Sequence, residues 1–139
     1  MTKPPLTEVP IRSAEELTSR WAAVLDPPIF GAHSLWLMWL DDDGRMLPTI
    51  VPIDDMPRLP DHALLSGLLS VLEGVAEGHL HGGGHFALAL CRPGRPEITE
   101  DDDGWVDALS EVLDDRIESS WSLHLAAGGR VLPLVDLPA

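Results

Sequence analysis

The sequence lacks several features that would place it in a specialised structural class. It has one cysteine, no tyrosine, and 9 Lys and Arg residues against 23 Asp and Glu residues. A single cysteine excludes an internal disulfide, so we expect no disulfide-stabilised scaffold. The longest apolar runs, such as Leu35 to Leu40, are far shorter than the roughly 20 residues that span a membrane. The formal net charge of −14 repels phosphates and argues against nucleic-acid binding.

The length of 139 residues is typical of one domain with its own hydrophobic core. Three prolines within residues 1–10 predict an irregular tail, and we expect a single domain over residues 11–139. Residues 1–5 lack the apolar stretch of a signal peptide, which favours a cytoplasmic location. Eight of the nine basic residues are arginines, a bias that we interpret as bacterial, GC-rich codon usage.

Local patterns predict three helices, each preceded by a capping residue. Ser13-Ala-Glu-Glu16 has the form of a capping box, in which Glu16 reaches back to the cap. Asp61 and Thr99 begin the other two helices. The first helix ends before Pro27 and the second at Gly78. The expected buried faces are Leu17, Trp21 and Val24 in the first helix, Leu64, Leu65, Leu68, Leu69, Leu72 and Ala76 in the second, and Trp105, Leu109, Val112 and Leu113 in the third.

Apolar runs bounded by turn residues predict the strands. They cover residues 35–40, 45–53, 86–90, 121–126 and 130–135, with a hairpin across Gly128-Gly129 between the last two. The resulting order, α-β-β-α-β-α-β-β, predicts an α/β (α+β) fold with a mixed sheet and packed helices. Trp36 and Trp39 lie on opposite faces of their strand, so both faces of the sheet should be covered.

Two groups of residues are candidates for metal binding or catalysis. His79, His81 and His85 surround a run of glycines in an expected loop, and imidazole is a common zinc ligand. Cys91 is followed by Arg92 and Arg95, and neighbouring cations lower the pKa of a thiol. A base for that thiol could come from His33, His85 or His124. The alternative interpretations are a solvated loop and a packed, inert cysteine.

Two acidic runs are candidates for binding a hard cation. Residues 41–43 lack the spacing and the final glutamate of a calcium loop. Residues 100–103 lie in the first turn of the third helix, where the helix dipole favours negative charge. We therefore interpret the first run as a solvated turn and the second as a helix start.

Five segments occur in an order that is distinctive as a set. They are residues 11–17 (IRSAEEL), 35–45 (LWLMWLDDDGR), the leucine-rich helix, 86–96 (FALALCRPGRP) and 99–102 (TEDD). In this order, and in the spacing of Gly94, Pro96, Thr99 and Asp102, the chain resembles the RadC-like branch of the JAB/MPN metalloprotease fold. The resemblance extends from about residue 11 to residue 136 and implies the cytidine deaminase-like architecture of that fold.

The resemblance also implies a zinc site, most of whose ligands this chain lacks. In the family, two histidines at the end of a strand and an aspartate at a helix start bind zinc, and a glutamate on an earlier strand acts as general base. In this chain Ala89 and Cys91 fall at the histidine positions, Pro93 at an oxyanion-stabilising serine, Asp102 at the aspartate, Thr99 at the capping serine and His33 near the glutamate. A hydrolytic zinc needs three protein ligands, a bound water and a base.

We therefore expect a non-catalytic JAB/MPN-like domain, with no resident cofactor, that acts as a protein-binding or regulatory module. Its partner would be another protein or a second copy in a homodimer, and neither a nucleic acid nor a membrane. The alternative is a divergent metal-dependent hydrolase, similar to an isopeptidase or peptidase, with zinc bound by His33, Cys91 and Asp102 or by His79, His81 and His85. A third alternative is thiol chemistry at Cys91.

Overall fold

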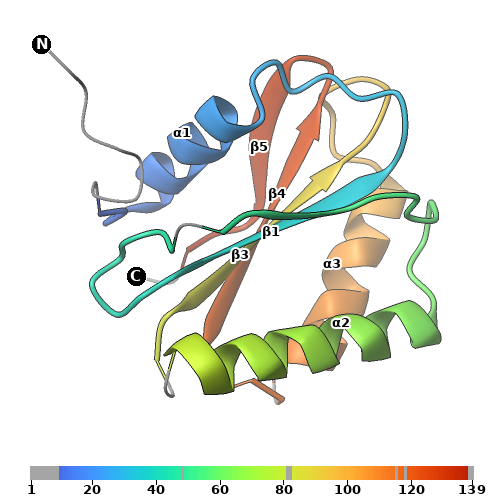
Figure 1. The fold of residues 1–139 in the computed structure, drawn as a ribbon. Helices are drawn as coiled ribbons and strands as arrows, with labels where there is room; N and C mark the ends of the chain where they lie inside the picture. Colours follow the sequence, from blue (N-terminus) through green and yellow to red (C-terminus); the bar gives the residue numbers. More distant parts are fainter. Residues whose placement is uncertain (1–9, 48, 81–82, 115, 118, 138–139) are drawn as a thin grey trace, which may run out of the picture.

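The computed structural model describes residues 10–47, 49–80, 83–114, 116–117 and 119–137. A mixed five-stranded sheet lies between α1 on one face and α2 and α3 on the other (Figure 1). The elements are α1 (Ala14–Val24), β1 (Ser34–Leu40), β2 (Val51–Ile53), α2 (His62–Val75), the π-helical turn η2 (Ala76–Leu80), β3 (His85–Cys91), α3 (Glu100–Leu113), β4 (Ser120–Ala127) and β5 (Arg130–Val135). The predicted order of helices and strands is confirmed.

The strands are ordered β2-β1-β3-β4-β5. β1 pairs antiparallel with both β2 and β3, and β4 pairs antiparallel with β5. β3 and β4 are parallel, and α3 forms the crossover between them, as parallel neighbours require. The sheet is therefore mixed, as predicted.

All three predicted caps are present. The side chains of Ser13, Asp61 and Thr99 each accept a hydrogen bond from the backbone N–H three residues later. Thr99 forms a complete capping box. The box predicted at Ser13 is wrong in one detail: the Glu16 carboxylate accepts from the N–H of Arg12 at 2.9 Å, one residue before the cap.

Two element boundaries differ from the sequence prediction. Gly78 does not end the second helix, because the chain continues past Val75 as the π-helical turn Ala76–Leu80. The strand predicted over residues 45–53 is reduced to β2 and an isolated bridge between Leu40 and Met46. Short-range sequence patterns do not specify which backbone groups an adjoining strand can reach.

Side chains alternate along the strands and form two core clusters. The cluster under α2 and α3 contains Leu37, Trp39, Leu88 and Trp105 among others. The cluster under α1 is smaller, and small residues such as Ala87 line its floor. Trp36 packs on the α1 side and Trp39 on the other, as predicted.

Proline occurs in both outer strands of the sheet. Pro52 of β2 pairs with Trp36 of β1, and Pro133 of β5 pairs with His124 of β4. Proline has no backbone N–H and is tolerated in sheets mainly at edges. Beside the second edge, the β4–β5 hairpin turns at Gly128 and Gly129, whose φ angles of 57° and 88° suit a type I′ turn.

One helical stretch qualifies the expectation that the chain has no membrane-spanning segment. Residues 62–80 form 19 continuous helical residues with a mean hydropathy of 1.2, long and apolar enough by these criteria alone to cross a membrane. Its buried leucines lie on one face: Leu65, Leu68, Leu69 and Leu72. This one-sided pattern and the compact sheet core are consistent with a soluble protein.

Candidate functional site

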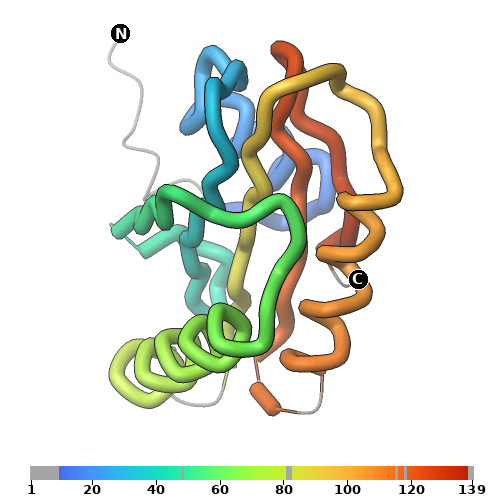
Figure 2. The backbone as a smooth tube through the Cα atoms, turned by 90° about the vertical axis from the view of Figure 1, so that its right-hand side faces the viewer, coloured from blue at the N-terminus to red at the C-terminus, as the bar shows by residue number. Residues whose placement is uncertain are grey.

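Several connections meet at one end of the sheet. β1 starts where β2 and β3 end, because β1 is antiparallel to both. We define the loop end as residues 26–33, 54–61, 92–99 and 128–129; Figure 2 shows the first, third and fourth of these segments together. Backbone hydrogen bonds join three of them: Met56 N–H donates to the His33 carbonyl at 3.1 Å, and Gly129 N–H donates to the Pro28 carbonyl at 3.1 Å. The loop end is thus a surface in which hydrogen bonds hold separate connections together.

A recess of about 250 Å³ opens at the loop end beside the start of α3. It contains two of the three residues in the predicted zinc set, His33 and Asp102. Its lining residues are His33, Arg58, Leu90, Arg92, Pro93, Thr99, Asp101, Asp102 and Trp105. We call it the Arg92 recess.

Arg92 and Asp102 form a buried ion pair in this recess. The guanidinium donates from Nε to Oδ1 at 2.9 Å and from Nη2 to Oδ2 at 2.8 Å, a two-pronged contact. The side chains of Arg92 and Asp102 are only 9% and 1% exposed. Burial alone would raise the pKa of Asp102, but hydrogen bonds from Arg92 and Thr99 lower it below its ordinary value.

The remaining donors of Arg92 are also used. Nη1 donates to the carbonyls of Pro93 and Arg95 at 3.0 and 3.3 Å, and Nη2 donates to the carbonyl of Glu97 at 2.7 Å. All five N–H groups of the guanidinium therefore have acceptors. The side chain fastens the β3–α3 connection to the first turn of α3.

Cys91 lies on the other face of the sheet. It is fully buried in the core cluster under α1, and burial raises the pKa of its thiol to about 12. The prediction that nearby arginines lower this pKa is therefore wrong, because Arg92 is directed at Asp102. His33, Cys91 and Asp102 are not brought together. Within the described ranges, no three His, Cys, Asp or Glu side chains are placed to hold one metal ion.

The histidine-rich segment is also divided. His79 lies in η2 with its ring 6.3 Å from that of Trp39, on the α2 side of the sheet. His85 lies in β3 on the α1 side. His81 falls outside the described residues. The expectation that residues 79–85 form a loop is wrong at both ends, where a π-helical turn and a strand occur.

Two buried histidines on the α1 side were not predicted from the sequence to be core residues. His85 shares hydrogen bonds of 2.7 and 2.8 Å with the hydroxyls of Ser120 and Ser122. His124 Nε2 lies 2.8 Å from the Thr18 hydroxyl, and its Nδ1 is buried with no hydrogen-bond partner among the described residues. Burial lowers the pKa of both rings to about 4, so they are neutral near pH 7 and weak bases. Alternation of Ser120, Ser122 and His124 along β4 was the available signal.

The acidic run at residues 41–43 builds a turn, as predicted. Asp41 Oδ1 accepts from the N–H groups of Asp43 and Arg45, both at 2.9 Å. Asp42 Oδ1 accepts from the N–H of Gly84 at 2.7 Å and links this turn to the start of β3. These carboxylates serve the backbone.

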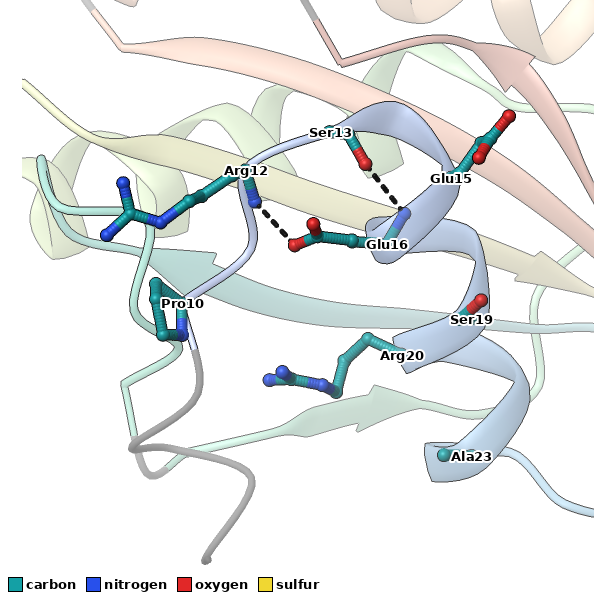
Figure 3. A pocket seen from close by; sticks show the side chains of 8 residues that line it. All are labelled: Pro10, Arg12, Ser13, Glu15, Glu16, Ser19, Arg20 and Ala23. Carbon is teal, nitrogen blue, oxygen red and sulfur yellow. Dashed lines mark hydrogen bonds between the residues drawn. The ribbon is translucent and has the colours of Figure 1, made fainter.

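A wider recess of about 650 Å³ lies along α1 (Figure 3). Its wall includes Ser13 and Glu16, whose hydrogen bonds begin α1. The Arg20 side chain crosses this recess, with Nη1 3.8 Å from the Met46 sulfur. We interpret the surface of this recess as part of the N-terminal end of α1.

Large apolar side chains are exposed mainly at the loop end. Of the four exposed ones in the described residues, Ile29, Leu59 and Ile98 belong to it, and Val71 lies on α2. Leu59 lies against α3, where its Cδ2 would be 3.4 Å from a Cβ at Gly104. Ile98 directly precedes the cap of α3. Leu59 and Ile98 each adjoin in sequence a residue that lines the Arg92 recess, Arg58 and Thr99 respectively.

Comparison with known proteins found no matching family model, no matching curated protein and no matching solved structure.

Proposed function

We propose that this chain is a non-catalytic JAB/MPN-like domain of the bacterial cytoplasm that binds another protein. The observation that carries the proposal is that the carboxylate of Asp102 is already paired with the guanidinium of Arg92. Asp102 is the one residue of a family ligand type at its expected position, and Arg92 holds both of its carboxylate oxygens. A guanidinium here supplies the positive charge that a zinc ion would supply in the family.

Displacing this guanidinium by a metal ion would be costly. It would leave a buried arginine without its counter-charge, and breaking a buried pair typically costs about 3–5 kcal/mol. Ala89 has no ligand atom, and Cys91 faces α1, so neither adds a donor beside Asp102. These arrangements favour a binding role for the Arg92 recess over a hydrolytic one.

The loop end supports protein binding in particular. Exposed aliphatic side chains on braced loops, next to a small recess, are the kind of surface on which interface anchors dock. Because backbone hydrogen bonds join three of the loop segments and the Arg92 side chain holds residues 93–97, little ordering would be needed on binding.

The test compares the full chain with Asp102→Asn and with Asp103→Asn, a matched change at the exposed neighbour. Each protein is incubated with zinc, dialysed, and measured for bound zinc and for hydrolysis of a fluorogenic isopeptide substrate. We expect sub-stoichiometric zinc and no hydrolysis in all three. Stoichiometric zinc in the wild type that disappears only in Asp102→Asn, or any hydrolysis with that pattern, would establish the hydrolase alternative.

A further inference from the structure

The loop end and the adjoining first turn of α3 combine exposed aliphatic side chains with an excess of negative charge. Leu59 and Ile98 are 44% and 52% exposed. Two segments of acidic residues flank them, one before α2 and one at the start of α3. The carboxylates are Asp54, Asp55, Asp61, Glu97, Glu100, Asp101 and Asp103.

Few of these charges are neutralised within the part of the chain that the structure describes. Asp101 forms a 3.5 Å ion pair with Arg58, whose side chain is 71% exposed. Asp102 is neutralised by Arg92 and does not contribute to the surface. The remaining cation on these segments is Arg95, so the surface around Leu59 and Ile98 is acidic overall.

We infer that the loop end binds a basic, aliphatic-containing segment of a partner protein. Apolar side chains of that segment would pack on Leu59 and Ile98, while its lysines and arginines would face the carboxylates beside α2 and α3. This inference rests on the proposed function and specifies the chemistry of the partner. Apolar anchors within a charged rim give both affinity and selectivity.

Charge argues for this occupant over the others. A second copy would set one acidic surface against another, and like charges across an interface are unfavourable. Nucleic acids and anionic membranes carry the same sign of charge as the loop end. A basic protein segment is the macromolecular partner whose charge complements this surface.

The experiment measures fluorescence anisotropy with three labelled 12-residue peptides added to the full chain. One contains lysine and leucine, one glutamate and leucine, and one lysine and serine. We expect binding of the lysine–leucine peptide, at least about tenfold weaker binding of the lysine–serine peptide, and none of the glutamate–leucine peptide. Raising salt from about 50 to about 300 mM should weaken binding several-fold.

Three variants locate the surface. Leu59→Ser with Ile98→Ser should weaken binding of the lysine–leucine peptide at least about tenfold. Glu100→Lys with Asp103→Lys should weaken it and reduce its salt dependence. Val71→Ser, an equally exposed apolar residue on α2, is the control and should bind like the wild type. Circular dichroism checks that each variant folds.

Absence of binding, equal binding of the glutamate–leucine peptide, or loss of binding in Val71→Ser comparable to that in the loop-end variants would overturn the inference. Any of these results in a chain that also lacks zinc and hydrolysis would reject this surface and partner class while leaving a non-catalytic role in place. Zinc-dependent hydrolysis that requires Asp102 would reject the proposed function itself.

Discussion

On the α3 side of the sheet, Arg92 and Asp102 are buried as ions, whereas on the α1 side His85 and His124 are buried as neutral rings. The ions keep their charges because two-pronged contact and three backbone carbonyls replace the lost water. The histidines meet hydroxyl groups, which bind a neutral ring as well as a charged one. The Arg92 guanidinium thus remains charged in a place where all five of its N–H groups have acceptors.

The largest effect should come from breaking the ionic pair. Arg92→Met leaves Asp102 buried with its main counter-charge removed, so the free energy of unfolding should fall by about 3–5 kcal/mol. Urea denaturation followed by tryptophan fluorescence measures the change.

The double variant Arg92→Met with Asp102→Leu separates the cost of an orphaned charge from the value of the pair. Removing both ions should restore most of the lost stability, since buried pairs are often no better than apolar replacements. If the double variant were as unstable as Arg92→Met, the stabilisation would come from the carbonyl contacts of Arg92 and the cap at Thr99.

Counted for one residue at a time, the histidine side should show the next largest effect, and this effect depends on pH. The pKa of His85 and that of His124 are each about 4 in the folded chain, whereas the ordinary value for histidine is 6.5. Between pH 4 and pH 6.5 the unfolded chain binds more protons than the folded chain. The contribution of the two neutral rings to the free energy of unfolding is therefore complete above pH 6.5 and falls as the pH drops towards 4. Each ring should contribute about 3 kcal/mol to this loss, measurable by urea denaturation across the range.

Substitution of one ring tests this assignment. His85→Gln should remove about half of the pH-dependent loss, while His79→Gln, at an exposed position, should leave the profile unchanged. The pKa of Asp102 is lowered from 3.8, so its contribution should persist until the pH falls below that value. An unchanged profile in His85→Gln would show that other groups control acid stability.

The smallest effects should come from the caps of the helices on each face. Thr99→Ala loses a complete capping box that also holds Asp102, and should cost about 1–2 kcal/mol. Ser13→Ala loses a single 3.1 Å hydrogen bond and should cost about 0.5–1 kcal/mol. Thermal and urea unfolding of the two variants measure the difference, and a larger loss at Ser13 would contradict the role given to the Thr99–Asp102 contact.

Features specified by neighbouring residues could be predicted from the sequence. Caps at Ser13, Asp61 and Thr99 depend on contacts three residues apart, and the order of elements follows from apolar runs between turns. Gly78 was misjudged because a glycine can equally lie within a π-helical turn. The JAB/MPN relationship remains a prediction.

The candidate site depended on contacts that sequence spacing does not reveal. Arg92 adjoins Cys91 in the chain, yet the two side chains serve opposite faces of the sheet, so the expected effect on the thiol pKa had the wrong sign. His85 and His124 lie 39 residues apart along the chain, and the parallel pairing of β3 and β4 brings their strands side by side with both rings on the α1 side.

The prolines in the two outer strands affect how copies of this chain behave when crowded. A strand with a complete row of outward backbone groups can act as a template that passes its pairing from molecule to molecule, as in a fibril. Pro52 and Pro133 each remove one N–H donor from the backbone of an outer strand. Growth of the sheet beyond one molecule is thereby discouraged, and association is left to side chains, whose contacts are selective and reversible.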